Sequence, residues 1–580
     1  MQNTHKKRRL KMKRKFKTLL SLVLAATCAL GTAACSSDSG NTDKPAGTSN
    51  PFVLKVFNFN GGYGSEWLSA LESRYEKEKA GKEIVVDGKT YDGVDVKIES
   101  IKKTMEEMVT SYNFATNHVY FQEDIKYMEY LRGGKIFDDA TEALVTPNPY
   151  DGGKTLESKL SEDQKEYYKV NGSYYGVPHY AGYVGINYDI DLFNELGLWI
   201  KDGYTYDGNT ANLAKCFTKD ASKKSAGPDG IKGNEDDGLP TTYDEFFMLC
   251  GYIAATDVPL MFLTDDNRQT YLNWFISSLA ASYEGREQTA LNYTFDGTAT
   301  NLISVDGSGN VTALPETEIT SENGYELAKQ AGKYYGLSFI EQIVDGKWYY
   351  NDDEIGNEKA HRLFIQGTND DKKAAMLIDG VWWENESNGI FMEEEQFGGK
   401  GRKERNYGFM PLPAATAEKA EERRAALAAG KKGYSLLDTH SSLCFIGKGI
   451  SADEKKVVID FIQYAYTDVS LAEFSKITDT TRALQYTMSE ADKAEMSAYG
   501  RSIITLQEKS EIVYAFSNSS FYQNNESTLG SYKDMFMSEI EKGKPVTVAL
   551  DQFLMGRSAK EYFDGIYQYR QGTLWNQLVK

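Results

Sequence analysis

The chain has 580 residues, of which 41% are hydrophobic and 26% are charged, a composition typical of soluble globular proteins. The length predicts two or three globular units, and the composition excludes a disordered chain and a polytopic membrane protein. The formal net charge is −19. Because phosphate backbones repel an acidic protein, we expect no binding to nucleic acid.

The N-terminus has the pattern of a secretory signal. Nine basic residues within the first 17 positions precede an apolar run at 19–30 and small residues at 31–34. A basic segment, a short apolar segment and small residues before a cleavage point are typical of signal peptides. The apolar run is shorter than the roughly 20 residues that span a bilayer. Residues 1–34 are therefore predicted to be a signal peptide.

The four residues from Thr32 to Cys35 resemble the lipobox of bacterial lipoproteins, with Thr32 where Leu is usual. In that motif the Cys becomes lipidated, as with palmitate, and the lipid inserts in the membrane. Residues 35–50 are small and polar, which predicts a flexible tether. We expect a protein anchored by lipid at the extracellular face of the cell membrane. Secretion without a lipid is the alternative.

From Pro51 onward, strand and helix patterns alternate. Residues 52–59 predict a strand, residues 61–64 a glycine-rich turn, and Ser65 a cap for the following helix. That helix places apolar residues at helical spacing, namely Trp67, Leu68, Leu71 and Tyr75. Further strands are predicted at 94–98 and 119–121. Strands separated by helices predict βαβ units in a mostly parallel sheet.

Three later regions depart from this alternation. Residues 201–240 are rich in Gly, Asp, Lys and Asn and predict an insertion, and the turn-rich residues 285–325 predict a hairpin or loop excursion. Residues 414–432 are mostly Ala, Glu, Arg and Lys, which predicts an exposed helix. The sequence shows no internal repeat of 20–50 residues, which argues against a solenoid.

The loop at 227–238 alternates glycines with oxygen-bearing side chains. Its candidate ligands for a metal are Asp229, Asn234, Asp236 and Asp237. Calcium takes six to eight oxygen ligands, often around tight turns. The spacing does not match an EF-hand, so we expect a structural Ca²⁺ site of another kind; a solvated turn without metal is the alternative. No cofactor is required for any function considered below.

Three cysteines lie beyond the lipobox, Cys216, Cys250 and Cys444. An odd number at wide spacing is not a disulfide framework. Buried free thiols are favoured over a bridge between Cys216 and Cys250.

Seven segments, in this order, resemble the family 1 extracellular solute-binding proteins, which include maltose-binding protein. They are residues 56–67, 119–139, 175–198, 239–246, 375–384, 406–413 and 451–474. Each motif alone is weak, but together they cover nearly the whole predicted mature chain. One departure is Tyr243, which stands where the family's helix start has Trp.

The resemblance implies an α/β, two-lobe, periplasmic-binding-protein-like fold with an interlobe ligand cleft. Lobe one is expected at 51–160 and 435–500, and lobe two at 161–434 and 501–580. It also implies a monomer that captures a carbohydrate, which we expect to be an oligosaccharide, and delivers it to the permease subunits of an ABC importer. Such a protein is not an enzyme.

Sugar binding needs aromatic faces for C–H patches and carboxylates or amides for hydroxyls. By resemblance, Trp382 falls on the family's stacking Trp, and its neighbour Trp383 points to the opposite side, so one of the two is expected to pack inward. Further candidates follow predicted strands or turns. They are Glu123, Asp124, Asn58, Asn60, Tyr63, Trp67, His179, Tyr180 and Tyr183. For each, a place in the core or at a helix cap is the alternative.

Enzymatic readings have little support. The sequence contains no P-loop, no Gly-x-Ser-x-Gly elbow and no His-Glu-x-x-His pair. A surface glycoside hydrolase stays open as the alternative function, since it needs only two carboxylates. Two further alternatives keep the binding fold: one changes the ligand to a peptide, polyamine or iron chelate, and the other makes the protein a receptor that presents its ligand to a membrane sensor.

Overall fold

The computed structural model describes residues 50–579, apart from 111–116, 124–125, 135, 207, 257, 262–267, 351–355, 368–371, 440–441 and 532–534. The predicted signal peptide, Cys35 and nearly all of the tether therefore lie outside the described residues, as does Asp124. From Asn50 onward the chain forms one compact unit.

The first sheet has five strands in the order β4-β1-β5-β19-β8. Its strands are β1 (Phe52–Phe59), β4 (Val94–Ile101), β5 (Val119–Gln122), β8 (Val177–Pro178) and β19 (Leu443–Ile446). β4, β1 and β5 are parallel, as predicted, whereas β19 is antiparallel to both of its neighbours. β8 was assigned to lobe two, so the first sheet extends beyond the expected boundary at residue 160.

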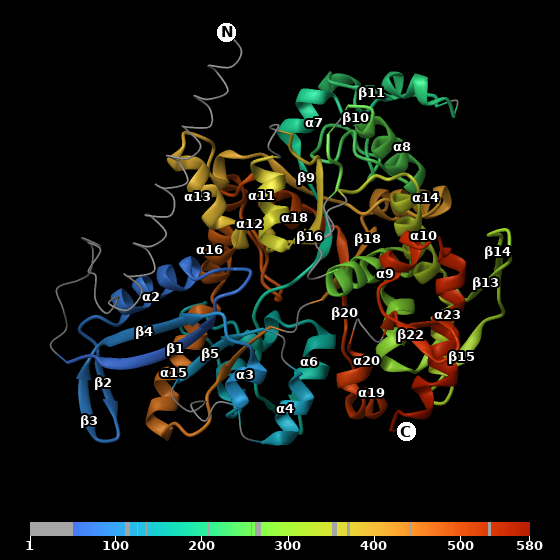
Figure 1. The fold of residues 1–580 in the computed structure, drawn as a ribbon. Coiled ribbons are helices and arrows are strands. Elements are labelled where there is room, and N and C mark those ends of the chain that lie inside the picture. The colour runs from blue at the N-terminus through green and yellow to red at the C-terminus, as the bar shows by residue number, and fades with distance from the viewer. Residues whose placement is uncertain are drawn as a thin grey trace, which may run out of the picture. The chain divides into compact units, whose positions relative to one another are not determined.

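Helices from both ends of the chain cover this sheet. α2 (Glu66–Lys79) buries Trp67, Leu68, Leu71 and Tyr75, the face that its periodicity predicts. Ser65 stands at its N-cap, but its side chain makes no capping hydrogen bond. α15 (Ala452–Ala465) and α16 (Asp468–Thr478) pack against α2. In Figure 1 the orange α15 lies beside the blue elements of the N-terminal part. The elements on this sheet are called the first half below.

The first half contains further small elements. They are β2 (Glu83–Val86), β3 (Lys89–Asp92), α3 (Met105–Thr110), α4 (Tyr127–Gly133), α5 (Thr141–Val145), α6 (Glu162–Tyr168), β6 (Lys169–Val170) and β7 (Ser173–Tyr174).

The second sheet has three strands in the order β16-β9-β17. β9 (Val184–Asp189) is buried along its whole length and pairs antiparallel with β16 (Met376–Gly380) and β17 (Tyr407–Met410). The expectation of mostly parallel pairing is therefore wrong for this sheet. The reason is that its outer strands come from distant segments, which return in the opposite direction, and not from consecutive βαβ units.

Helices and a parallel strand pair complete the second half. The pair is β18 (Tyr434–Asp438) with β20 (Ser510–Tyr514). The kinked α9 (Arg268–Thr294) packs on this pair and on β9, and α18 (Ala498–Glu508) packs on β17. The other helices are α7 (Ile190–Leu196), α8 (Tyr243–Ala254), α10 (Ala331–Asp345), α11 (Asn357–Ile365), α12 (Trp383–Glu386), α13 (Asn388–Gln396), α14 (Ala417–Ala428), α17 (Glu490–Glu495), α19 (Ser520–Asn524), α20 (Glu526–Leu529), α22 (Ala549–Leu554) and α23 (Ala559–Gly572).

The predicted excursions are present. In the 285–325 region, β12 (Gly297–Ala299) pairs with β15 (Thr317–Ile319), and β13 (Ile303–Val305) pairs with β14 (Val311–Ala313). In the 201–240 region, β10 (Trp199–Ile200) pairs with β11 (Phe217–Thr218); one 3-10 helix, Thr210–Cys216, lies between these strands, and another, Ala221–Lys223, follows them. β21 (Ser538–Glu541) and β22 (Lys544–Val546) form a further hairpin near the C-terminus. α14 confirms the helix predicted at 414–432.

Three segments connect the two sheets and lie side by side. His179 N donates to Ser442 O at 3.0 Å, and Thr439 N donates to Gly182 O at 2.8 Å. Ala181 N donates to Thr481 O at 3.2 Å. These crossing segments, residues 179–183, residues 438–439 with 442, and residues 480–482, carry the chain between the halves. Most of the buried apolar side chains of both halves belong to one continuous cluster, and two small clusters are separate from it.

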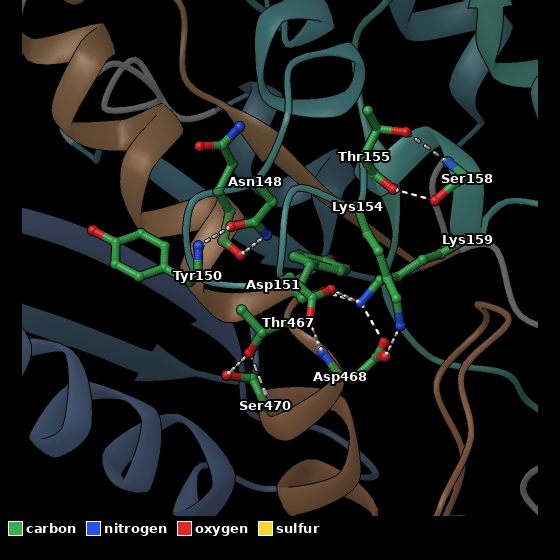
Figure 2. Close-up of polar contacts among 12 residues, drawn as sticks. Asn148, Tyr150, Asp151, Lys154, Thr155, Ser158, Lys159, Thr467, Asp468 and Ser470 are labelled. Atoms are coloured by element: carbon green, nitrogen blue, oxygen red, sulfur yellow. Dashed lines mark hydrogen bonds and ion pairs between the residues drawn. The ribbon is translucent and has the colours of Figure 1, made fainter.

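A polar network fixes the start of α16 to the loop before α6 (Figure 2). Lys159 Nζ lies 2.6 Å from both Asp151 and Asp468, and Lys154 Nζ lies 2.7 Å from Asp468. The Lys159 side chain is only 6% exposed. Thr467 Oγ1 accepts a hydrogen bond from Ser470 N, which caps the helix. The network connects the start of α16 to the loop before α6, and removing one of its partners would leave a charge near Lys159 uncompensated.

Two further findings concern the described residues as a set. No described helix combines the length and hydropathy that crossing a membrane requires.

Cys216, Cys250 and Cys444 are buried free thiols. The favoured prediction of free thiols is therefore confirmed, and the bridge between Cys216 and Cys250 is not formed.

Candidate functional site between the two halves

The glycine turn after β1 reaches the second half. Asn58 Nδ2 holds the turn by donating to Gly64 O and to Ser100 Oγ, each at 3.0 Å. A Cβ added to Gly62 would come within 2.7 Å of Trp382 Cβ. Only glycine permits this approach, so the turn lies directly against Trp382. Asn58 is itself 2% exposed and supports the turn from behind.

Trp382 belongs to a cluster of aromatic side chains. It follows β16, where the predicted strand and Asp-Gly turn place it, and is the N-cap residue of α12. Its Nε1 donates to Tyr271 Oη at 3.1 Å, and its ring meets Trp274 edge-on, with centroids 6.0 Å apart. Tyr271 and Trp274 both come from α9 and were not predicted. Burial raises the pKa of Tyr271 well above its ordinary value. Trp382, Tyr271 and Trp274 are called the aromatic cluster below.

Trp383 points the other way, as its alternation with Trp382 suggests. Its ring is fully buried against Phe364, Tyr407 and Tyr499. This position places Trp383 in the core of the second half, and it presents no face to the junction of the halves.

Tyr63 and Tyr180 connect the turn to the crossing segments. Their ring centroids are 3.8 Å apart, and Tyr63 Oη donates to Ala181 O at 3.0 Å. Both rings are buried. Tyr183, three residues further, is 1% exposed, and burial followed by the charge of Asp438 raises its pKa.

Trp67 and His179 lie deeper, in the core of the first half. Their ring centroids are 4.9 Å apart, and Phe121 packs on both. Burial, followed by the charge of Arg482, lowers the pKa of His179 well below its usual value. The position of Trp67 therefore agrees with its helical spacing in α2, which predicts a core residue. Neither ring reaches the aromatic cluster.

Glu123 directly follows β5 and is 9% exposed. A Cβ on Gly61 would come 3.2 Å from its Oε1, so the carboxylate lies against the glycine turn. The charge of Glu123 also contributes to the raised pKa of Tyr63 and of Tyr271, after burial. Glu123 is therefore the predicted acid that the fold brings to the junction.

A polar cavity of about 600 Å³ lies beside the turn, within the range of roughly 300–1,000 Å³ of small-molecule sites. Asn60, Gly61 and Tyr63 line it from the first half. The second half supplies side chains of α11, α12 and α13 that were not predicted. They are Asn357, Glu358, His361, Arg362, Asn385, Glu386, Asn388 and Glu393.

A buried ion pair stands in the cavity wall. His361 Nε2 lies 2.8 Å from Asp379 Oδ2, and both side chains are buried. Burial acts to lower the pKa of His361, but the hydrogen bond and charge of Asp379 outweigh it, so the pKa is raised. The sequence could have signalled only Asp379, in the Asp-Gly turn before Trp382, because His361 comes from a separate helix.

Direct contacts join the two halves around this cavity. Asn388 Nδ2 donates to Glu66 Oε1 at 3.4 Å, and Asn385 Nδ2 donates to Thr478 O at 2.6 Å. Arg402 Nη2 donates to Ile477 O at 2.5 Å. Cations and amide donors are favoured at these carbonyls, which end α16. The structure therefore holds the halves against each other, with the turn closed on Trp382.

A larger cavity, of about 980 Å³, adjoins the crossing segments. Tyr183, Asp438 and Tyr514 line it together with charged residues such as Lys159 and Arg286. Of the predicted ligand residues it touches only Tyr183, whereas the polar cavity and the turn beside it involve Asn60, Tyr63 and the contact with Trp382. We therefore take the polar cavity with the aromatic cluster as the candidate site.

The Asp-rich loop at 227–238 is separate from this site. Asp229 Oδ2 accepts from Lys509 Nζ and from Asn234 Nδ2, each at 2.8 Å. Asp236 Oδ2 accepts from Asp229 N at 3.2 Å. A Cβ on Gly227 would lie 2.1 Å from Asp236 O, so the backbone curls tightly on itself.

Two carboxylate oxygens of this loop bear on whether it binds a cation. Asp237 Oδ2 accepts from Gly233 N, whereas Oδ1 of Asp236 and Oδ1 of Asp237 are buried without a hydrogen-bond partner. Burial, followed by the charge of Asp229, raises the pKa of Asp236 to about 7. Within the described ranges, no three His, Cys, Asp or Glu side chains are grouped to hold a metal. The calcium site stays a prediction.

Comparison with known proteins gives the fold. No family model and no curated sequence matches the chain. The solved cyclic alpha-maltosyl-1,6-maltose binding protein from Arthrobacter globiformis matches with a TM-score of 0.50 and 12% identity, over 91% of this chain and 100% of that one. A chitin oligosaccharide binding protein matches with a TM-score of 0.48 and 14% identity, over 90% and 98% of the two chains. The binding protein RafE in complex with raffinose matches with a TM-score of 0.49 and 14% identity, over 89% and 98%. The likeness to the Arthrobacter protein confirms the expected two-lobe α/β fold.

Proposed function

We propose that this protein captures a carbohydrate, an oligosaccharide, between its two halves and delivers it to the permease subunits of an ABC importer. The observation that carries the proposal is the aromatic cluster, which the fold places where the two halves meet. Flat rings cover the C–H faces of a sugar, and the amides and carboxylates of the adjoining polar cavity suit its hydroxyls. Binding proteins for maltosyl-maltose, chitin oligosaccharide and raffinose are similar in fold, which agrees with this use.

Binding rather than catalysis fits the same geometry. Three carboxylates of the polar cavity are held by a cation or an amide, Glu66 by Asn388, and Glu358 and Glu393 by Arg362. Closure of the halves on a ligand would place it against the turn at Gly62, and the closed form would be the one that a permease recognises. The closing contacts at Asn385 and Arg402 support such a state.

Calorimetric titration tests the proposal directly. The chain from Asn50 onward, which forms one compact unit, would be titrated with plant, host and microbial oligosaccharides, while reducing ends are assayed in parallel. Micromolar affinity for one linkage class without any release of reducing ends is the expected result. Release of reducing ends would instead support the glycoside hydrolase. Binding of peptides but of no sugar would move the ligand to another class.

The lipid anchor is part of the same proposal and rests on the sequence alone. A Cys35→Ser variant should leave the membrane fraction for the medium or the soluble fraction, because the single acylated position is lost. A Cys28→Ser variant, altered within the predicted signal, is the matched control and should stay with the membrane. Equal partitioning of the two variants would contradict the anchor.

A further inference from the structure

The polar cavity contains acidic and basic side chains in similar numbers, but they are not equally free to meet a ligand. Arg362 donates to Glu358 and Glu393 at 3.0 and 2.6 Å. Arg402 donates to the end of α16 at Ile477 O. The arginines of the wall are thus already engaged by other groups of the protein.

The remaining cations are no better placed. His361 is bound to the buried Asp379, which cancels its charge at short range. Lys102 Nζ comes to 3.9 Å from Glu386, and its side chain is 71% exposed, so solvent screens it strongly. Among the described residues that line the cavity, no lysine or arginine therefore offers a ligand a buried charge that is not already paired.

Glu386 is the acid that stands deepest in this wall. It lies at the end of α12, four residues after Trp382, and its side chain is 20% exposed. Burial raises its pKa, and the charge of Asp379 adds to this rise, while His361 acts against it. The environment thus disfavours a negative charge at this place, and it would disfavour a second one on a ligand for the same reason.

We propose that the polar cavity accepts uncharged, hydroxyl-rich sugar units and rejects acidic ones, and that Glu386 is the residue that sets this specificity. The inference rests on the proposed function. Hydroxyl groups can donate to the Glu386 carboxyl and accept from the amides of Asn60, Asn357 and Asn388. A carboxylate on the sugar would instead lie beside Glu386, where the arginines and the histidine of the wall are already paired within the protein and Lys102 is screened by solvent. Such a poorly compensated charge is strongly disfavoured.

The test compares three ligands of one length and linkage. They are the tightest neutral oligosaccharide from the panel above, its derivative with a carboxylate at the non-reducing end, and its derivative with a carboxylate at the reducing end. One of the two ends occupies the cavity, so one derivative should bind at least tenfold more weakly than the neutral sugar. In Glu386→Gln this difference should shrink about tenfold, and in Glu386→Asp it should persist.

Glu421→Gln is the matched control. It makes the same change at a side chain of α14 that is 74% exposed and lies outside the lining of the cavity, so the discrimination should alter less than threefold. The melting temperature of each variant shows that it is folded. Equal affinity of the wild type for all three ligands, or unchanged discrimination in Glu386→Gln, would overturn the inference. If the neutral sugar itself does not bind, the proposed function fails and the inference falls with it.

Discussion

The junction of the two halves and the Asp-rich loop share two features, a glycine at a close contact and a buried carboxyl, but the features have different effects in the two regions. Each has a glycine that permits a close approach, Gly62 in one and Gly227 in the other, and each lies near a buried carboxyl with a raised pKa. Gly62 brings one half against the other, at Trp382. Gly227 brings the loop against its own backbone, at Asp236. The glycine between the halves brings two distant parts of the chain together at the candidate site, whereas the glycine within the loop only shapes the loop.

This comparison is sharpened by the buried carboxyls. Glu384 follows Trp383 in α12, is fully buried, and both of its oxygens are without a hydrogen-bond partner. Burial, followed by the charge of Asp479, raises its pKa to about 8. Asp236 in the loop has a pKa of about 7. If the two regions differ as argued, changes at the junction should alter binding, and changes in the loop should alter only stability.

The largest effect is expected from Trp382→Ala. Losing the ring from the aromatic cluster should weaken sugar binding about 100-fold, or roughly 3 kcal/mol, the size typical of a central aromatic contact. Titration calorimetry measures it. Trp383→Phe is the control, since that ring lies in the core. It should lower the free energy of unfolding by about 1–3 kcal/mol and leave the affinity unchanged. The reverse pattern would break the comparison.

Gly62→Ala should have the next largest effect. Its Cβ would collide with Trp382, so the halves cannot close fully, and we expect about tenfold weaker binding. Gly64→Ala changes the same turn at a φ of +64° with no atom within 4 Å of the new Cβ. That variant should be destabilised by about 1–2 kcal/mol through backbone strain while binding normally. Equal loss of affinity in both variants would show that the turn acts through its conformation and not through the contact.

The pH dependence of stability should identify the two buried carboxyls. A carboxyl with a raised pKa binds its proton more tightly in the folded chain than in the unfolded chain. Its contribution to stability is therefore full at low pH and is lost as the pH rises, up to about 7 for Asp236 and about 8 for Glu384. Chemical denaturation between pH 5 and 9 should show Asp236→Asn flattening the fall below pH 7, and Glu384→Gln flattening it up to pH 8. Identical profiles for wild type and both variants would contradict the assigned shifts.

The smallest effect concerns calcium. If the loop binds Ca²⁺ with the millimolar affinity of many extracellular sites, 5 mM Ca²⁺ should raise the melting temperature by about 1–3 °C. Mg²⁺ at the same concentration is the control for ionic strength. The rise should vanish in Asp236→Asn and should not alter sugar affinity. A rise that persists in the variant would place the ion elsewhere.

The sequence predicted the fold well because the fold depends on local patterns. Alternating burial in β1 and helical spacing in α2 are visible in the residues themselves, and the order of motifs supplied the two-lobe arrangement. The position of Trp382 was predictable because it follows a strand and an Asp-Gly turn; its role in binding stays a prediction. Tyr271 and Trp274 were missed because aromatic residues in a long helix are usual in any core.

Other parts of the site depend on pairings that a single sequence does not contain. His361 meets Asp379 only because α11 packs beside β16. Glu386 and Asn388 reach the cavity only because the second half closes on Glu66. Conversely, Trp67 and His179 looked like ligand groups because they follow strands and turns, but the same positions fill the core of the first half. Local rules predict where a strand ends, and tertiary packing decides which side of it faces a ligand.

The position of β19 in the first sheet has a consequence for how the protein is made. β5 ends at Gln122, but its neighbour β19 begins at Leu443. At roughly 5–20 residues per second, a ribosome needs on the order of tens of seconds to supply that partner. Until then, β5 has an open edge of the kind that pairs with other chains. A nascent chain held unfolded until its synthesis is finished would avoid this hazard, and a truncation before Leu443 should yield aggregates and not a stable first half.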